Sequence, residues 1–366
     1  MLRQSLKFLP GIRGFFTAVG AEIENVGTTS QLAVKNGARI TVVMPVYNAA
    51  PFLEQSLEPL LGMIERSEIF ELIVVDDHST DDSAKVAKRL GARVLSTEGR
   101  SGPGAARNLA ASHAAGDILW FVDADVIVHA DAASKIAKDF SDPTTAAVFG
   151  SYDDRPPARN FLSQYKNLIH RYYHQHGKRE ASTFWAGCGA IRKAQFLEAR
   201  GFDTERYNRP SIEDIELGYR LRANGHRILL NPSVQGTHLK HWSFFNLIHT
   251  EVIRRAIPWS RLMLQESGLI DDLNVSISER LRAVLAGLLA LACIAAITGL
   301  VAWWVPVIFL LAVVAGNWQL TCFFYQRRGA LFTVGALLFH QLYYLYSAAA
   351  YAWAWLGHQA SRLVRS

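Results

Sequence analysis

The sequence has few cysteines and no dense run of basic residues. Its three cysteines, Cys188, Cys293 and Cys322, are scattered over 366 residues. This spacing predicts neither a disulfide framework nor a cysteine-ligated metal, and it fits a reducing compartment. Without a Lys/Arg stripe or a binding motif, a nucleic-acid partner is not expected. The net charge of +6 instead fits attraction to an anionic membrane surface.

Charged residues are also missing from two C-terminal stretches, 283–325 and 329–361. About 20 apolar residues are enough to cross a bilayer. We therefore expect transmembrane helices at about 283–301 and 305–325. A third apolar segment, 331–356, either crosses as well or is re-entrant or interfacial. Arginines flank the outer ends of the first two spans, so the positive-inside rule predicts a multi-pass protein of the inner (cytoplasmic) membrane whose soluble part faces the cytoplasm.

The remaining chain divides into three parts. Residues 1–36 are interpreted as a leader and not a signal peptide, because Pro10-Gly11 interrupts the apolar stretch that a signal peptide needs. The alternative for the start of this segment is an amphipathic piece on a membrane surface. Residues 37–240 have ordinary globular composition. Residues 241–279 are expected to form an interfacial amphipathic segment, Trp242–Trp259, followed by a polar linker. The tail begins at residue 280. No internal repeat is found, which argues against a transporter built from repeats.

Short apolar runs alternate with helical patterns in the globular part. This alternation predicts βαβ units, a parallel sheet and hence an α/β fold. Such sheets bind ligands at the carboxyl ends of their strands. The first four predicted strands are 40–45, 71–77, 92–95 and 118–122, and later ones are 183–191, 227–230 and 234–238, with a helix at 212–223.

Five polar motifs follow these strands or open helices. Asp123 and Asp125 stand one residue apart after a buried strand, where two carboxylates can share a divalent cation that neutralises a diphosphate. Taken alone, they are equally well explained as two solvated acids at a strand end. Glu213-Asp214 alone is equally well explained by acid enrichment in a first helical turn. The other motifs are Pro45-Val-Tyr-Asn48, Asp76-Asp77 and Gly102-Pro-Gly-Ala-Ala-Arg-Asn108.

In their order and spacing, the motifs resemble those of inverting family 2 glycosyltransferases of the membrane-anchored bacterial type. The sequences that carry the resemblance are PVYN, VVDDHSTD, GPGAARN, FVDAD, WAGCGAIRK and IEDIELGYRL, which together cover Ile40 to His238. The resemblance implies the GT-A fold, a Rossmann-like mixed sheet. It also implies an enzyme of the hexosyltransferase type that uses a nucleotide-diphosphate sugar and a divalent metal, Mn²⁺ or Mg²⁺.

The resemblance further implies a role for each motif. Asp214 is the general base, and Glu213 positions it or binds acceptor hydroxyls. Asp125 binds the metal together with His238, for which His241 is the alternative. The acceptor side is formed by Trp185, Gly187 and Cys188. The nucleotide sugar is contacted by Pro45, Val46, Tyr47, Asn48, Asp77, Gly104, Arg107, Asp123, Ala124 and Arg255.

Three other functions are weighed against a single sugar transfer to a lipid or lipid-linked acceptor. A processive polysaccharide synthase is disfavoured because residues 254–259 (RRAIPW) replace the Gln-x-x-Arg-Trp element of such enzymes. A nucleotidyltransferase of similar fold needs a glycine-rich basic loop after the first strand, which PVYN lacks. A catalytically silent membrane scaffold would not need the acidic motifs. The sequence specifies neither the sugar and nucleotide nor the oligomeric state.

Overall fold

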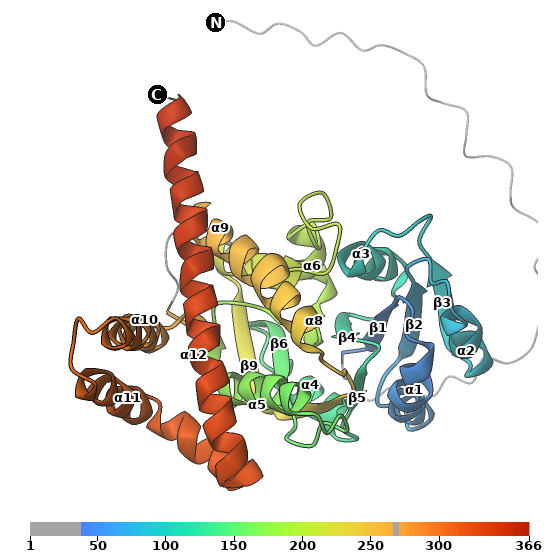
Figure 1. Cartoon of the computed structure of the whole chain (residues 1–366). Coiled ribbons are helices and arrows are strands. Elements are labelled where there is room, and N and C mark those ends of the chain that lie inside the picture. The colour runs from blue at the N-terminus through green and yellow to red at the C-terminus, as the bar shows by residue number, and fades with distance from the viewer. Residues whose placement is uncertain (1–37, 266–270, 366) are drawn as a thin grey trace, which may run out of the picture. The chain divides into compact units, whose positions relative to one another are not determined.

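The computed structural model describes residues 38–265 and 271–365. They form a mixed α/β domain followed by long apolar helices (Figure 1). The predicted leader and residues 266–270 of the predicted linker lie outside the described residues.

A nine-stranded sheet is the centre of the domain, in the order β3-β2-β1-β4-β8-β6-β9-β5, with β7 paired to β9. Strands β1 to β4 are parallel to one another, as the alternating pattern predicts. Strand β8 then joins β4 in antiparallel orientation, so the sheet is mixed. The strands are β1 Ile40–Val46, β2 Glu71–Asp76, β3 Arg93–Ser96, β4 Ile118–Val122, β5 Val126–Val128, β6 Thr145–Tyr152, β7 Glu180–Ala181, β8 Cys188–Arg192 and β9 Arg227–His238.

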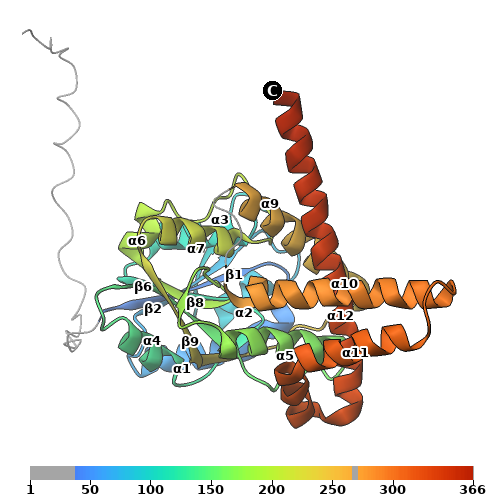
Figure 2. The same ribbon diagram turned by 90° about the vertical axis from the view of Figure 1, so that its left-hand side faces the viewer.

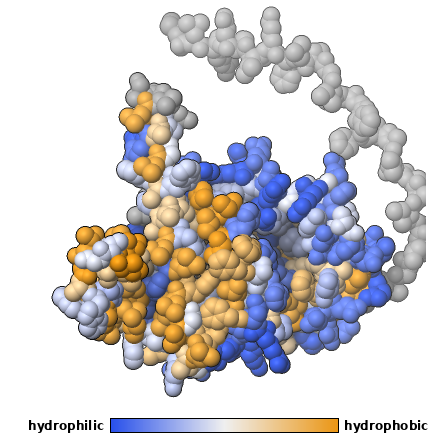
Figure 3. Space-filling model, viewed as in Figure 1, coloured by the Kyte–Doolittle hydropathy of each residue, from blue (hydrophilic) through white to orange (hydrophobic). Residues whose placement is uncertain are grey.

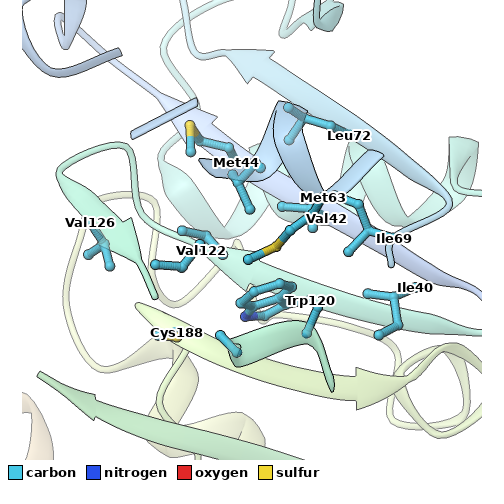
Figure 4. Close-up of a cluster of buried hydrophobic side chains, with 14 of the residues drawn as sticks. Ile40, Val42, Met44, Met63, Ile69, Leu72, Trp120, Val122, Val126 and Cys188 are labelled. Carbon is cyan, nitrogen blue, oxygen red and sulfur yellow. The ribbon is translucent and has the colours of Figure 1, made fainter. Parts of the chain in front are cut away.

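Helices cover both faces of the sheet, and two hydrophobic clusters lie between the layers. Alternate residues of a strand point to opposite faces. Val42 and Trp120 therefore join the cluster under α1 and α4, whereas Val43 and Phe121 join the one under α3, α6 and α7. Figure 4 shows the first cluster, in which Cys188 lies beside Trp120. The helices are α1 Ala50–Glu65, α2 Ser83–Arg89, α3 Pro103–His113, α4 Ala132–Asp139, α5 Phe161–His176, α6 Lys193–Glu198 and α7 Glu213–Ala223.

The structure differs from the predicted strands in three places. The strand predicted at 183–191 begins only at Cys188, because the preceding residues form the loop whose Gly187 carbonyl accepts a hydrogen bond from Asp123 N at 3.1 Å. The strands predicted at 227–230 and 234–238 are one strand, β9, whose pairing with β6 absorbs the Asn231-Pro232 step through a register shift. Strand β5 has only three residues and was not predicted.

The C-terminal region is a series of helices. An α10–α11 hairpin projects from the domain, and α12 runs across its base (Figure 2). Helix α12 is broken at Gly329, which has φ 76°. The elements are α8 Phe244–His249, a π-helix η1 at Thr250–Ala256, α9 Ile257–Gln265, a 3₁₀ turn η2 at Leu273–Val275, α10 Ile277–Ile297, α11 Trp304–Gly316 and α12 Trp318–Arg365.

In the described part of the chain, one helix, α10, is long and apolar enough to cross a membrane. The count rises to two if α11 and α12 are taken as one broken span, but these two helices meet at 72°. The predicted span at 305–325 is therefore not a straight helix. The surroundings of the two tryptophans predicted to be interfacial also differ from the prediction. Trp242 and Trp259 are buried, and the exposed aromatic residues of this segment are Phe244 and Phe245.

Candidate active site

A cavity of about 1130 Å³ opens at the carboxyl ends of β1 and β4. The loop after β1, the Asp-x-Asp turn after β4 and the first turn of α7 all contribute to its wall. The structure thus brings most of the predicted site residues together. Those that line the cavity are Pro45, Tyr47, Asn48, Arg107, Asp123, Ala124, Asp125, Trp185, Gly187, Glu213, Asp214, His238 and Arg255.

Antiparallel pairing of β5 with β9 places Asp125 beside His238. Val126 is paired with His238, and Leu239 N donates to Asp125 O at 2.8 Å. As a result, His238 Nε2 lies 3.5 Å from Asp125 Oδ2. The Tyr152 ring stacks on the His238 ring at a centroid distance of 4.3 Å, which fixes the imidazole plane. Burial raises the pKa of Asp125, but His238 and then Lys240 outweigh it and hold the pKa below its usual value.

This pair provides two of the donors that a divalent cation needs. Within residues 38–265 and 271–365, no group of three His, Cys, Asp or Glu side chains is arranged to hold a metal by itself. A carboxylate oxygen and an imidazole nitrogen suit an ion such as Mn²⁺, which takes both kinds of ligand. The residues therefore fit a cation whose remaining ligands are phosphate oxygens and water.

Arg107 of α3 bridges two carboxylates in the cavity wall. Its Nη2 donates to Asp123 Oδ1 at 2.6 Å, and its Nη1 donates to Glu213 Oε1 at 3.3 Å. Burial lowers the pKa of Arg107, but the carboxylates of Asp123 and Glu213 outweigh it, so the net shift is upward. The guanidinium therefore stays charged and fixes the position of Asp123 relative to the first turn of α7.

The two acids at the start of α7 have different surroundings. Glu213 is buried, and besides Arg107 it accepts a hydrogen bond from Ser211 N at 2.8 Å. Burial and the neighbouring Asp214 raise the pKa of Glu213. Asp214 is held by two backbone donors, Ala186 N at 3.0 Å and Ile215 N at 2.9 Å. Asp214 is the more exposed of the two acids, which suits it to meet a substrate.

Four predicted site residues lie outside the cavity wall. Val46 and Cys188 are fully buried in the cluster under α1, because each side chain points to that face of the sheet. Burial raises the pKa of the Cys188 thiol to about 12. Gly104 is buried in the first turn of α3, where a Cβ would lie 3.3 Å from Phe202. Asp77 is also buried and is bound to the glycine-rich loop.

Asp77 accepts three hydrogen bonds from the segment before α3. Ser101 N and Gly102 N each donate at 2.8 Å, and Thr97 Oγ1 donates at 3.0 Å. This loop conformation requires a glycine at position 102, because the residue has a φ of +87° and an added Cβ would lie 2.7 Å from Asn208 O. In this structure, therefore, Asp77 holds the loop that leads into α3.

We expect Asp77→Ala to lower the free energy of unfolding by about 2–4 kcal/mol, because one buried and one partly buried backbone N–H donor lose their acceptor. Urea unfolding followed by circular dichroism measures this change. Thr97→Val removes only one of the three bonds and should cost about 1 kcal/mol. If Asp77→Ala unfolded at the urea concentration of the unchanged protein yet lost donor affinity, a direct role in nucleotide binding would be indicated instead.

Sequence reasoning missed the aromatic wall of the cavity. Trp185 lies against Tyr152, His170 and His174, with centroid distances of 4.9, 4.6 and 5.1 Å. Burial lowers the pKa of His174 to about 4, so this ring is neutral at physiological pH. The only signal in the sequence was the basic, aromatic and histidine-rich composition of residues 153–178, which does not say which side chains turn inward.

The cavity continues from these groups into the C-terminal helices. Lys166 and Glu251 form a buried ion pair in its wall, with Nζ and Oε2 2.7 Å apart. Beyond this pair the lining comes from α10 and α12. It includes the charged residues Glu279 and Arg280 and several aromatic rings of α12. The apolar and small residues of this lining include Ala283, Val284, Gly287, Ser347, Ala348 and Tyr351.

Comparison with known proteins supports a transferase. Residues 41–201 match the family described as "Glycosyl transferase family 2". "Glycosyltransferase GlyG" of Streptococcus pneumoniae is 30% identical over 118 residues, which cover 31% of this chain and 38% of that protein. "Validoxylamine A glucosyltransferase" of Streptomyces hygroscopicus is 26% identical over 249 residues, 55% of this chain and 56% of that protein. The chain thus spans well under two thirds of the length of these relatives.

Among solved structures, the mannosyltransferase PcManGT from Pyrobaculum calidifontis, in complex with GDP-Man and Mn²⁺, has a similar fold. It is 21% identical with a TM-score of 0.55, and the similarity covers 87% of this chain and 88% of that one. The fold is therefore the α/β GT-A fold expected from the motifs. The family match and the named relatives support a family 2 glycosyltransferase domain in this part of the chain.

Proposed function

We propose that this protein is a membrane-attached inverting glycosyltransferase. It transfers a sugar from a nucleotide-diphosphate sugar to a hydroxyl of a lipid or lipid-linked acceptor at the cytoplasmic face of the inner membrane. One observation carries the proposal: a single cavity joins Asp214 and Asp125 to the apolar lining of α10 and α12. A nucleotide-sugar donor at the carboxylate end of this cavity and an acceptor whose apolar chain lies along α10 and α12 can therefore meet in it.

The donor end of the cavity is suited to a nucleotide diphosphate. Tyr47 and Asn48 line the cavity from the loop after β1. Asn48 Oδ1 accepts a hydrogen bond from Thr80 N at 2.8 Å, which connects this loop to the loop after β2. Asp123 would bind hydroxyls of the ribose or of the donor sugar. Arg255 of the π-helix lines the same cavity and supplies positive charge for the leaving diphosphate.

Asp125 and His238 would hold a divalent cation against the diphosphate. When bound, such a metal supplies positive charge that stabilises the departing phosphate oxygens. The choice between Mn²⁺ and Mg²⁺ is decided by metal titration of nucleotide release.

Asp214 acts on the acceptor. Its carboxylate takes the proton of the attacking hydroxyl while that oxygen bonds to the anomeric carbon. The bond from this carbon to the diphosphate oxygen breaks, and the electron pair leaves with the nucleotide diphosphate. Because the acceptor attacks from the face opposite the leaving group, the anomeric configuration inverts. The two backbone N–H groups on Asp214 keep the carboxylate oriented for this step.

The apolar end of the cavity gives a direct test of the acceptor. An added Cβ at Gly287 meets no atom within 4 Å, so Gly287→Leu should fold and place its side chain in the cavity. We expect at least a tenfold rise in the KM for a lipid acceptor, about 1.4 kcal/mol. Slow hydrolysis of the donor by water should not change, because the catalytic groups are untouched.

Gly357→Leu is the matched control, since Gly357 also has open space around it but lies outside the cavity wall. Equal KM values for the two variants would argue against an acceptor chain in this part of the cavity. Release of nucleotide from a panel of nucleotide sugars by membranes containing the protein tests the function itself. A catalytically silent scaffold would release none at any metal concentration.

A further inference from the structure

We propose that α12 lies along the cytoplasmic surface of the bilayer and does not cross it, while the α10–α11 hairpin is the inserted element. The C-terminus is then on the same side of the membrane as the catalytic domain. This inference rests on the membrane attachment proposed above, and it selects the interfacial alternative for the third apolar segment.

The first half of α12 is bound to the catalytic domain by polar contacts. Arg328 Nε donates to Gln164 Oε1 at 2.7 Å, and its Nη2 donates to Asp154 O at 2.6 Å. Further along, His340 Nδ1 lies 2.8 Å from the Tyr165 hydroxyl. Because residues 328 and 340 are both hydrogen-bonded to the catalytic domain, we infer that the segment between them lies along the domain and does not lead away from it into the hydrocarbon core.

The middle of α12 is held by further contacts, whereas most residues after Tyr351 are exposed. Tyr343 accepts a hydrogen bond from Asn274 Nδ2 at 2.9 Å. Tyr351 packs against the cluster formed by Trp259, Leu262 and Met263. Beyond Tyr351 only about a dozen residues of the helix remain, and a span needs about 20. The length and apolar composition of 331–356 alone would have allowed a crossing, but these contacts leave no stretch free to make one.

The hairpin has the opposite properties. Its two arms start and end at the same level, since Arg282 Nε of α10 donates to Gly316 O of α11 at 2.8 Å. No charged residue occurs from 283 to 325, and Leu291, Ile294 and Ile297 of α10 are exposed. Helix α11 has 13 residues and is thus about 20 Å long, too short to cross a core of about 30 Å alone. The bend of 72° then turns the chain into α12.

The face of α12 turned away from the domain fits a lipid surface. Leu331, Val334, Leu338 and Leu342 form an exposed apolar stripe, and Leu331 is 90% exposed. Figure 3 shows this apolar surface continuing over the neighbouring helices. Helix α8 extends this apolar surface, because the Phe244 ring packs on the Phe339 ring with a centroid distance of 6.4 Å. A contiguous exposed apolar face of this kind marks a protein or membrane contact.

Basic side chains at the edge of this face select the membrane as its partner. A groove of about 860 Å³ beside Leu331 is lined by Arg155, Arg159 and Arg328 together with Phe161. Arginines level with exposed apolar residues match anionic headgroups above acyl chains. The face therefore fits the headgroup layer of a bilayer that contains anionic lipid.

Residue depth in the bilayer tests the inference. Spin labels are attached to single cysteines in the full chain, with Cys293 and Cys322 replaced by serine and buried Cys188 retained. We expect similar shallow depths for Leu338→Cys and Trp353→Cys in vesicles that contain anionic lipid, and a greater depth for Leu291→Cys in the hairpin. A depth that increases steadily from residue 338 to residue 353 would overturn the inference, because a crossing helix must show it.

Labelling from the two sides of the membrane provides a second readout. Ser361→Cys should react from the same side as Ser141→Cys, a surface position in the catalytic domain. Reaction from opposite sides would also overturn the inference while leaving membrane attachment intact. Recovery of the unchanged protein in the soluble fraction after cell lysis would instead contradict the proposed membrane function itself, so the two failures are distinguishable.

Discussion

Asp214→Asn is expected to lower kcat for sugar transfer by about 10²–10⁴-fold, the range for loss of a general base. The amide keeps the shape of the carboxylate, and its oxygen can still accept one of the two N–H groups, from Ala186 or Ile215. The fold should therefore survive, and only proton removal from the acceptor should fail. Initial rates of transfer at saturating donor and acceptor measure the effect.

The design includes a control for a general effect of removing an acid. Asp131→Asn makes the same chemical change at an exposed position where the carboxylate pairs only with Lys135, and it should leave kcat unchanged. Glu213→Gln separates positioning from proton transfer, because it weakens the contact with Arg107 without removing Asp214. Unchanged transfer by Asp214→Asn would exclude Asp214 as the base.

Asp125→Ala is expected to reduce transfer at least 10²-fold and to raise the metal concentration that gives half-maximal activity. The variant leaves His238 as the only protein ligand of the proposed pair, so charge on the leaving diphosphate loses its main stabilising ion. Nucleotide release measured over a Mn²⁺ titration reports both quantities. Thermal unfolding without metal checks that the variant is folded.

Tyr152→Ala provides a graded comparison for this metal site. It removes the ring that stacks on His238 but keeps both proposed ligands, so the metal requirement should rise less than in Asp125→Ala. If Asp125→Ala and the unchanged protein responded identically to Mn²⁺, the Asp125–His238 pair would not be the metal site. The order of the unchanged protein, Tyr152→Ala and Asp125→Ala in metal requirement is thus as informative as the size of any single effect.

The local pattern of the sequence was enough to predict the first strands and the position of the acids. Apolar runs of four to six residues, each ending in polar groups, indicated β1, β2 and β4 at nearly their observed bounds. Because the carboxyl ends of these parallel strands share one edge, Asn48 and Asp123 were expected at one site. The structure places both in the same cavity wall.

The parts that sequence could not predict depend on pairing over long distances. Strand β5 is too short to give a pattern, so nothing indicated that it would pair with β9. The face to which a strand residue points changes with each position, so the sequence did not indicate that the side chains of Val46 and Cys188 lie in the core. An amphipathic pattern likewise does not identify its partner. The apolar side of Trp259 is covered by the protein, where Nε1 donates to the Tyr219 hydroxyl at 2.9 Å.

If Asp125 and His238 form the proposed metal site, the pairing of β5 with β9 also sets when that site is completed during synthesis. A nascent chain that has just exposed Asp125 still lacks His238, because β9 is translated much later. The segments that follow β9 directly are those that lead into the hairpin. Under the proposed function, metal-assisted cleavage of the donor would therefore begin only when these segments emerge from the ribosome. An incomplete chain would then not deplete the cell's supply of activated sugar.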